Sequence, residues 1–365
     1  MSEARVVCGE CVAEMGRMEA ESFDLVLTDP PYFKVKDEAW DKQWDNSTAF
    51  LSWLDTVASE WQRLLKPNGS LYCFASPRMS ARVETMLSRR FQVLNCIRWI
   101  KEEGWHKKTD RYSLRSWLSN WESIIFCEHP GADSIAEGGA GYEGKCDELR
   151  GFVFEPLRAY LRGEWERAGL NGDDANAACG TASMAGRHYF TTSQWRLPTA
   201  EHYASLRLYA NERGRKPAPP YEQYHTAPRS RFESLRSDYE YLRSDYESLR
   251  RPFSVSAQVP YTDVWHFPSV LAHSSKHPCE KPVGMMRHII KASSRLGAKV
   301  LDSFCGTGAV GVACAELGRE FTGIEMDGEY CEIARKRIEA ASRQQRMEFE
   351  EKSEERREKR EGRKV

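Results

Sequence analysis

The sequence predicts an α/β protein built on a mostly parallel sheet and carrying a helical insertion. The run Phe23–Thr28 is apolar enough to form a buried strand of a parallel sheet, and two prolines end it abruptly. A second strand, a glycine turn, an amphipathic helix and a third strand follow one another between residues 299 and 325. At 365 residues the chain exceeds one typical domain, so a domain with an insertion is expected.

An acidic residue and an aromatic residue flank the two prolines at the end of the first strand. In open α/β sheets, ligands bind at this carboxyl end of the strands. A carboxylate and a free carbonyl can accept both hydrogens of an exocyclic amine, while a tyrosine ring can stack on a flat base. The segment Asp29-Pro30-Pro31-Tyr32 therefore indicates chemistry on the amine of a base, although by itself it is equally consistent with a turn that ends a strand.

A glycine turn follows the strand that begins at Lys299. Gly306 and Gly308 let the backbone approach a ligand where any Cβ would collide. Glu325 ends the next strand, 19 residues after Gly306, where an acidic side chain can accept the two hydroxyls of a nucleoside ribose. The spacing is not that of the dinucleotide fingerprint, because the third glycine of that pattern would fall in a different frame. The turn and the acid together predict a nucleoside site.

Together these segments resemble the β class of S-adenosylmethionine-dependent DNA amino-methyltransferases, in which the catalytic motif precedes the cofactor motif. The resemblance covers roughly residues 1–130 and 260–340, and it implies a Rossmann-like methyltransferase sheet with S-adenosyl-L-methionine as cofactor. Asp29, Pro30, Pro31 and Tyr32 match the catalytic motif IV, whose Asp form favours adenine N6 over cytosine N4. Three further strands fit the same sheet, at residues 69–74, 93–100 and 122–127.

The same resemblance implies cofactor-binding residues in four segments. Residues 277–282 match motif X, 302–308 match motif I, 323–327 match the ribose-binding segment, and 8–11 match the segment that holds the adenine ring. Motif I departs from the commoner pattern in having Ser303 in place of proline, a change that removes no required group. The implied cofactor-binding residues are Glu10, Cys11, Asp29, His277, Lys281, Asp302, Ser303, Phe304, Cys305, Gly306, Thr307, Gly308, Glu325 and Met326.

Composition excludes several classes of protein. No apolar run reaches the ~18 residues of a membrane span, and no charged-then-apolar leader opens the chain. A soluble, cytoplasmic protein with no membrane partner is therefore expected. Eleven cysteines at irregular spacing argue against a secreted disulfide framework. Cys8 and Cys11 form a Cys-x-x-Cys pair, but no second pair or nearby His completes a zinc site, so no metal is expected.

Basic and aromatic residues gather in two regions, although the formal net charge of the chain is −1. Residues 184–231 carry eight Lys or Arg against three acids, and a second cluster spans residues 98–117. Cations mixed with aromatic rings suit a phosphate backbone and unstacked bases, but a solvated face above buried tryptophans would have the same composition. The candidate DNA-binding residues are Lys107, Lys108, Arg111, Arg187, His188, Gln194 and Arg196.

The insertion, about residues 131–258, separates the two parts of a catalytic domain expected at 1–130 and 259–342. Its segment 156–196 predicts a helix, a tight turn, a short helix, a glycine turn and a last helix with Ser183 as its N-cap. This is the layout of a helix-turn-helix for target recognition, yet three helices packed for structural reasons would give the same pattern. A three-heptad repeat at 232–250 predicts an arm that packs on its own domain or on a second subunit, and a charged tail spans 343–365.

The motifs and the resemblance together predict a site-specific enzyme that methylates the N6 amine of an adenine flipped out of double-stranded DNA. We also expect a homodimer, because the heptad repeat has an apolar stripe that needs a surface to cover it. The alternatives are a cytosine-N4 methyltransferase, an RNA methyltransferase, and a DNA-binding regulator with a decayed catalytic core. The sequence leaves open the recognition sequence and whether a partner restriction endonuclease exists.

Overall fold

The computed structural model describes residues 3–35, 39–101, 112, 115–130, 155–191, 198–214, 251–255, 261–270 and 279–361. The chain divides into two compact units, one made of Met1–Gly139 with Arg251–Val365 and the other of Ala140–Arg250. Each unit has its own hydrophobic core and is described by itself. No helix in the described ranges combines the length and the apolar character that crossing a bilayer requires.

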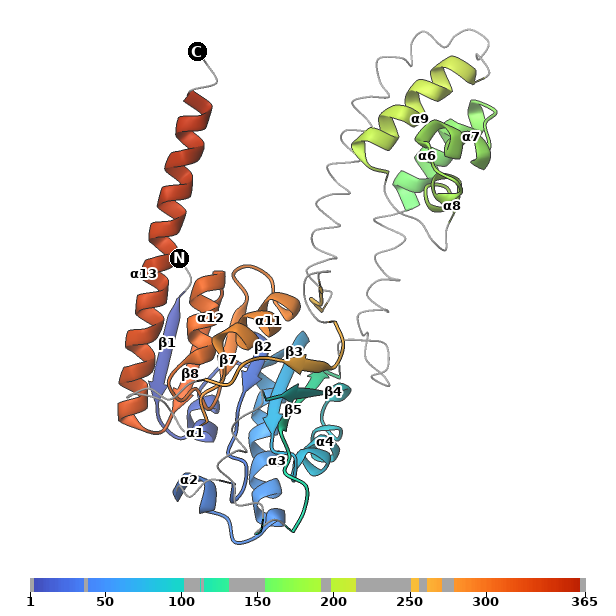
Figure 1. Ribbon diagram of the computed structural model, residues 1–365. Coiled ribbons are helices and arrows are strands. Elements are labelled where there is room, and N and C mark those ends of the chain that lie inside the picture. Colours follow the sequence, from blue (N-terminus) through green and yellow to red (C-terminus); the bar gives the residue numbers. More distant parts are fainter. Residues whose placement is uncertain are drawn as a thin grey trace. The chain divides into compact units, whose positions relative to one another are not determined.

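Within the described residues of the first unit, eight strands form one sheet in the order β1-β8-β7-β2-β3-β5-β4-β6 (Figure 1). Neighbouring strands pair in parallel except at β5, which runs antiparallel to both β3 and β4. The predicted α/β fold with a mostly parallel sheet is confirmed. The strands are β1 (Ala4–Cys8), β2 (Phe23–Thr28), β3 (Leu65–Ala75), β4 (Gln92–Ile100), β5 (Trp121–Glu128), β6 (Val264–His266), β7 (Lys299–Asp302) and β8 (Glu320–Glu325).

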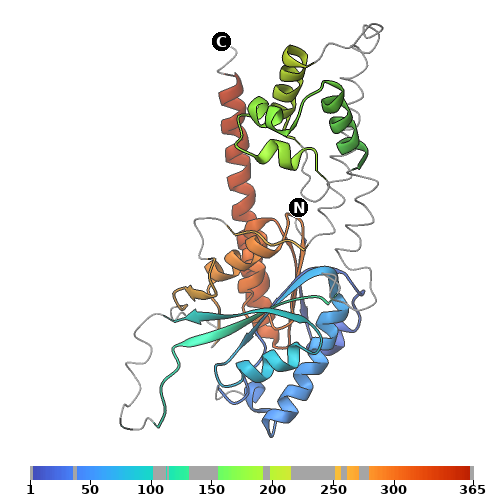
Figure 2. The same ribbon diagram turned by 90° about the vertical axis from the view of Figure 1, so that its right-hand side faces the viewer.

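Helices cover both faces of this sheet (Figure 1, Figure 2). Successive residues of a strand point to opposite faces, so Val26 belongs to one core cluster while Leu25 and Leu27 belong to the other. This burial on both sides explains why the centre of β2, Leu25–Leu27, is continuously apolar. One layer contains α1 (Cys11–Met15), α3 (Ser47–Leu64) and α4 (Ser80–Leu87), with α2 (Ala39–Lys42) preceding α3, and the other contains α11 (Val283–Ser293), α12 (Ala309–Leu317) and α13 (Gly328–Glu361).

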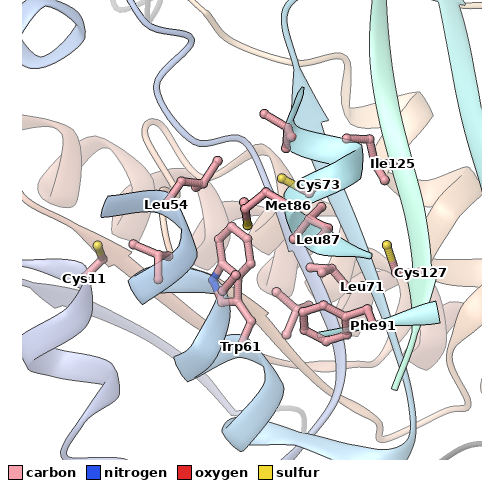
Figure 3. Close-up of a cluster of buried hydrophobic side chains, with 14 of the residues drawn as sticks. Cys11, Leu54, Trp61, Leu71, Cys73, Met86, Leu87, Phe91, Ile125 and Cys127 are labelled. Atoms are coloured by element: carbon pink, nitrogen blue, oxygen red, sulfur yellow. The ribbon is translucent and has the colours of Figure 1, made fainter. Parts of the chain in front are cut away.

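Trp61 of α3 is a large, fully buried side chain of the first core cluster. Figure 3 shows its ring among side chains from α3, β3 and α4, including Leu54, Leu71 and Met86. The indole Nε1 donates a hydrogen bond of 2.9 Å to the hydroxyl of Ser303, directly after β7. The core therefore holds the start of the predicted glycine turn in place.

Two strands that the sequence did not predict lie at the edges of the sheet. β1 lies beside β8, and all five of its residues are exposed or half-buried, while β6 has only three residues. An edge strand buries less of its surface than a central one, so it carries little of the hydrophobic pattern on which a prediction relies. α13 continues to Glu361 and so includes most of the segment expected as a charged tail.

The described part of the second unit is helical. Three of its helices lie where the sequence predicted them, and the fourth, α9, was not predicted. Trp165, Ala175, Ala185, Tyr189 and Leu206 are the buried residues of its core. The heptad repeat at 232–250 lies outside the described residues, and the role of this unit in target recognition stays a prediction. The helices are α6 (Glu155–Arg167), α7 (Gly172–Cys179), α8 (Met184–His188) and α9 (Ala200–Arg213).

Capping fixes the ends of these short helices. The side chain of Asn171 and that of Asp174 each accept the other's backbone N–H in a capping box at the start of α7, and Gly180 ends the helix with φ of 64°. Ser183 takes the predicted N-cap position of α8, but its side chain makes no capping hydrogen bond. The hydroxyl of Thr181 instead accepts the N–H of Ala185 at 3.2 Å.

Gly186 of α8 packs against the backbone of α7, which generates a prediction about stability. A Cβ at this position would lie 2.6 Å from the carbonyl oxygen of Gly172, and a backbone oxygen cannot move aside as the end of a side chain can. We expect Gly186→Ala to destabilise the second unit by about 1–3 kcal/mol, measured by thermal or urea unfolding. Gly163→Ala is the matched control. Nothing lies within 4 Å of its added Cβ in α6, so it should stabilise by about 0.5–1 kcal/mol. Equal stability of the two variants would contradict this packing.

Candidate active site

A cavity of about 470 Å³ lies at the carboxyl ends of β2, β7 and β8. Asp29 follows β2, Gly306 follows β7, Glu325 ends β8, and all three line this one cavity. Its volume falls within the roughly 300–1,000 Å³ that is usual for small-ligand sites. The two segments that the sequence singled out therefore face a common space. Other predicted site residues on its wall are Glu10, Cys11, Pro30, Pro31, Tyr32, Lys281, Asp302, Ser303, Phe304, Cys305, Thr307 and Met326.

A hydrogen bond between the ends of β2 and β7 fixes these two segments side by side. The strands pair in parallel with Leu25 opposite Val300. Beyond the paired residues, the hydroxyl of Thr28 donates a 3.0 Å hydrogen bond to Oδ1 of Asp302. Burial raises the pKa of Asp302 to about 7, although the Phe304 N–H and the Thr28 hydroxyl act in the opposite direction. Asp302 thus joins the two strands and does not project into the ligand space as a free charge.

Asp29 is paired with Lys281, and the nearby hydroxyl of Tyr32 also lowers its pKa. Nζ of Lys281 lies 2.5 Å from Oδ2 of Asp29. The other oxygen, Oδ1, is buried and has no hydrogen-bond partner among the described residues. Burial raises the pKa of Asp29, and the ammonium of Lys281 offsets part of that rise. An unpartnered buried carboxylate oxygen costs free energy, so a donor from a ligand is the natural partner for it.

Lys281 is shared between two carboxylates. Its Nζ lies 3.4 Å from Oε2 of Glu122, a residue of β5, and about 5.1 Å from the ring centres of both Tyr32 and Phe74. Burial opposes its charge, but Asp29 and Glu122 together raise the pKa of Lys281 above its usual value. Glu122 was not among the predicted site residues. A charged residue at the start of a buried apolar strand was the only signal for it in the sequence.

Tyr32 is largely buried. The side chain is 7% exposed, and its hydroxyl donates a 2.8 Å hydrogen bond to Oε2 of Glu122. Burial raises the pKa of Tyr32 well above its usual value, so the phenol stays protonated and keeps this bond. The ring still lines the cavity beside Asp29. The ring of the next residue, Phe33, packs against that of Phe50, with ring centres 5.6 Å apart.

The buried carboxylate of Asp41 holds the backbone that follows the two prolines. Its Oδ1 accepts the N–H of Tyr32 at 2.8 Å and its Oδ2 accepts the N–H of Val35 at 2.6 Å. Between them, Phe33 and Lys34 have φ of 62° and 57°, a left-handed conformation that L-residues rarely adopt. Asp41 thus stabilises a strained turn that sets the position of Tyr32. Nothing in the sequence signals this role, because acidic residues are common in loops.

The predicted nucleoside site is compact. The carboxylate of Glu325 accepts the N–H of Gly306 at 2.8 Å and the N–H of Asp327 at 3.0 Å. Burial raises the pKa of Glu325, and these two N–H groups offset part of the rise. Gly308 has φ of 82° at the start of α12, and a Cβ there would lie 3.0 Å from that of Ala334. The glycine turn and the acid are therefore in direct contact.

The segment around Lys281 is tied to the glycine turn by its neighbour Glu280. The hydroxyl of Thr307 donates to Oε2 of Glu280 at 3.0 Å, and Nη2 of Arg337 lies 2.9 Å from Oε1. Arg337, on α13, also donates to the carbonyl and the hydroxyl of Thr307. His277, the other residue predicted in this segment, lies outside the described residues.

The N-terminal segment contributes Glu10 and Cys11 to the wall of the cavity. The carboxylate of Glu10 caps α1 by accepting the N–H groups of Val12 and Ala13 at 3.1 and 2.8 Å. Cys11 donates to the same carboxylate, and burial together with Glu10 raises the pKa of its thiol. Both residues line the cavity as expected by position, but their polar atoms already have partners. Met326 lies at the rim and is 65% exposed.

The predicted DNA-binding residues are only partly covered by the structure. Arg187 and His188 form the last turn of α8 in the second unit. The others lie outside the described residues: Lys107, Lys108, Arg111, Gln194 and Arg196. Their contacts with DNA stay predictions. In the described part of the chain, no group of three or more His, Cys, Asp or Glu side chains is arranged to hold a metal ion.

Residues 23–336 match a protein family described as DNA methylase, the N6/N4 methyltransferases. The chain belongs to this family. It is 23% identical to the DNA adenine methyltransferase YhdJ of Escherichia coli K12 over 345 residues, which are 92% of this chain and 83% of that protein. The solved structure of the PvuII cytosine-N4-specific DNA methyltransferase has a TM-score of 0.51 and 11% identity, with 93% of this chain and 87% of that chain covered. The protein TTHA0409 of Thermus thermophilus, solved with S-adenosyl-L-methionine, has a TM-score of 0.47 and 18% identity over 93% and 94% of the two chains.

Family membership makes this protein a DNA methyltransferase of the N6-adenine or N4-cytosine type. The predicted family is confirmed. DNA is accordingly its substrate class. The alternative of an RNA methyltransferase loses its support. The family includes both adenine-N6 and cytosine-N4 enzymes, so membership alone does not identify the target base.

The role of Asp41 generates a prediction about the loop that carries Tyr32. We expect Asp41→Ala to destabilise the protein by about 1.5–3 kcal/mol, because hydrogen bonds to a charged group contribute about that much. Amide hydrogen exchange at Tyr32 and Val35 should accelerate by at least roughly tenfold, since about 1.4 kcal/mol corresponds to a factor of ten. Asp45→Ala removes an exposed carboxylate nearby and should change neither quantity. Protection at both amides that survives Asp41→Ala would show that the loop is held by something else.

Proposed function

We propose that this protein transfers the methyl group of S-adenosyl-L-methionine to the N6 amine of an adenine in double-stranded DNA. The observation that carries the proposal is Oδ1 of Asp29, a buried acceptor that has no hydrogen-bond partner among the described residues and lies at the cavity where β2, β7 and β8 end. An exocyclic amine supplies the donor that this oxygen lacks. Because the amine of a paired base cannot reach a cavity of this kind, the base has to be flipped out of the duplex, at a cost of a few kcal/mol.

The residues of the chain orient the target and do not form a covalent bond with it. Asp29 accepts one hydrogen of the amine through Oδ1, and the carbonyl of Pro30 accepts the other, so that the nitrogen lone pair points along the cavity. The ring of Tyr32 lines the wall beside Asp29 and offers a flat surface to a base. The bound cofactor supplies an electrophilic sulfonium methyl group. Alignment of this kind is worth several kcal/mol of the activation barrier.

The opposite half of the cavity suits the cofactor. Each carboxylate oxygen of Glu325 accepts one backbone N–H, which leaves further lone pairs for the two hydroxyls of a ribose. The turn at Gly306 and Gly308 brings the backbone close to the space that the methionine half would occupy. These residues fit S-adenosyl-L-methionine by both shape and hydrogen-bonding capacity.

The choice of adenine over cytosine rests on two supports. The segment at 29–32 has the Asp form of the catalytic motif, and a relative that aligns over most of the chain is described as an adenine methyltransferase. The proposed target-recognition unit is the helical one, with Arg187 and His188 of α8 among its DNA contacts, and the active form is proposed as a homodimer. The test is nucleoside mass spectrometry of duplex DNA incubated with the purified protein and deuterium-labelled cofactor. Labelled N6-methyladenine is expected, and labelled N4-methylcytosine would overturn the choice of base.

Asp29→Ala should abolish methyl transfer while leaving the dissociation constant of S-adenosyl-L-methionine within roughly tenfold, because its main role is to align the target amine. The measurements are single-turnover kinetics and calorimetric titration. Asp24→Ala is the matched control, since Asp24 lies on the strand that Asp29 follows, also pairs with a lysine, and is not part of the cavity wall. Full turnover by Asp29→Ala would refute the proposed mechanism.

Glu325→Ala should weaken S-adenosyl-L-methionine binding by about 1–3 kcal/mol, the usual contribution of hydrogen bonds to a charged group. Glu320→Ala, at the other end of β8, is the control and should leave affinity unchanged. Calorimetric titration of the two variants measures the difference directly. If Glu325→Ala bound the cofactor as tightly as the unaltered protein, the ribose partner would have to lie elsewhere.

A further inference from the structure

Two charged residues beside the proposed catalytic segment have no part in the function described so far. Glu122 is near the start of β5, and Lys101 directly follows β4. The antiparallel pairing of these strands sets Ile100 opposite Trp121, and the N–H of Lys101 donates to the carbonyl of Asn120 at 2.7 Å. The sheet itself therefore brings Lys101 and Glu122 together next to the cavity, and their side chains form an ion pair.

We infer that Glu122 and Lys101 are positioning residues that set how tightly the ammonium of Lys281 holds Asp29. The inference rests on the proposed role of Asp29 in holding the target amine. Glu122 and Lys101 act on Asp29 through Lys281 in the reaction already proposed. Neither residue is placed in contact with the substrate or the cofactor.

The geometry is that of one ammonium shared by two buried carboxylates. Nζ of Lys281 is 2.5 Å from Oδ2 of Asp29 and 3.4 Å from Oε2 of Glu122, and its side chain is only 6% exposed. Lys101 pairs with Oε1 of Glu122, the oxygen turned away from Lys281. The four side chains alternate as carboxylate, ammonium, carboxylate, ammonium. Such a row is electrically balanced, which is what burial of charges requires.

Removing the charge of Glu122 and removing the charge of Lys101 have opposite effects on Asp29. Without the charge of Glu122, Lys281 has Asp29 as its sole carboxylate partner in the row and holds it more tightly. Without the charge of Lys101, Glu122 is free to attract Lys281, and the hold on Asp29 weakens. Asp29 must act as a carboxylate to accept the amine hydrogen. Protonation of Asp29 therefore causes kcat to fall on the acidic side of its pH profile, which is called the acid limb below. The two variants are therefore expected to move that limb in opposite directions.

The same carboxylate also orients Tyr32. The phenol hydroxyl donates to Oε2 of Glu122, the oxygen that faces Lys281. Glu122 therefore contributes in two ways that variants can separate. Its charge acts on Lys281, and its carboxylate accepts the hydrogen bond of Tyr32. Among the described residues, the other titratable groups that interact with Asp29 or this row are those of Tyr32, Cys73, Cys279 and Asp302.

The sign of each shift follows from the charges. Burial raises the pKa of Asp29, Lys281 lowers it and Glu122 raises it again. Glu122→Gln removes one raising influence, so the acid limb should move to lower pH by roughly half a unit or more, since charges within about 4–6 Å shift a pKa by about 1–3 units. Lys101→Met keeps the length of the side chain and removes its charge, so the limb should move to higher pH by a similar amount.

Two further variants distinguish an effect on Asp29 from a general loss of protein stability. Glu128→Gln is the matched control, because Glu128 is a buried carboxylate of the same strand, pairs with Arg251 at 2.6 Å and is absent from the cavity wall. It should leave the acid limb unchanged even if it lowers stability. Glu122→Asp keeps the charge but shortens the reach to the Tyr32 hydroxyl. It should restore the acid limb of the unaltered enzyme while kcat stays reduced.

The experiment measures single-turnover kcat against pH for the unaltered enzyme and the four variants with duplex DNA and S-adenosyl-L-methionine. Opposite shifts for Glu122→Gln and Lys101→Met, with none for Glu128→Gln, are expected. Reduced activity with an unchanged acid limb in both variants would overturn the inference and leave Glu122 a structural residue. If Glu122→Gln fails to fold, the upward shift of Lys101→Met decides the question.

A second measurement needs no turnover and keeps this inference distinct from the proposed function. Carbon-13 NMR titration of the Asp29 carboxyl, assigned with Asp29→Asn, should show the same opposite shifts in the two variants. Shifted Asp29 titrations in a protein that methylates no adenine would refute the proposed base and support the row of charges. Unshifted titrations in a protein that does methylate adenine would refute the row of charges and support the proposed base.

Discussion

The parallel pairing of β2 with β7 brings together two segments that lie 274 residues apart in the chain, and the hydrogen bond from Thr28 to Asp302 fixes their ends. Everything at the site depends on this contact. Since parallel strands end at the same edge of a sheet, Asp29 and the turn at Gly306 must face one cavity. The order of the two motifs along the chain has no influence on this, because the sheet determines which strand ends are neighbours.

Charge pairing accounts for the arrangement around that cavity. Buried ions lose hydration, and only close partners compensate for the loss. Lys281 lies between Asp29 and Glu122, while Glu280 pairs with Arg337 of α13. These two neighbouring residues, one basic and one acidic, tie the segment after β6 to both halves of the site. Oδ1 of Asp29 has no hydrogen-bond partner among the described residues, and it is the atom to which the proposed function assigns the target amine.

The features that the sequence could predict are those with local signals. The run Phe23–Thr28 is mostly apolar because it is buried on both faces, and the glycines at 306 and 308 mark a turn with positive φ. Glu122 has no such signal, since its partner Tyr32 lies 90 residues away and only the folded sheet brings them together. The same holds for β1, whose edge position leaves its residues largely exposed. In the second unit, Ser183 has a residue type that favours the N-cap position, but the hydroxyl of Thr181 is the one that accepts a backbone N–H of α8.

The central claim is that one cavity holds the cofactor and the target amine at adjoining strand ends. A crystal structure of the protein with S-adenosyl-L-methionine tests it most directly. The ribose hydroxyls should lie on the carboxylate of Glu325, and the sulfonium methyl should point toward Oδ1 of Asp29, leaving room for an amine nitrogen at roughly 3–3.5 Å from the methyl carbon. A cofactor bound away from Glu325, or a methyl group directed away from Asp29, would contradict the account.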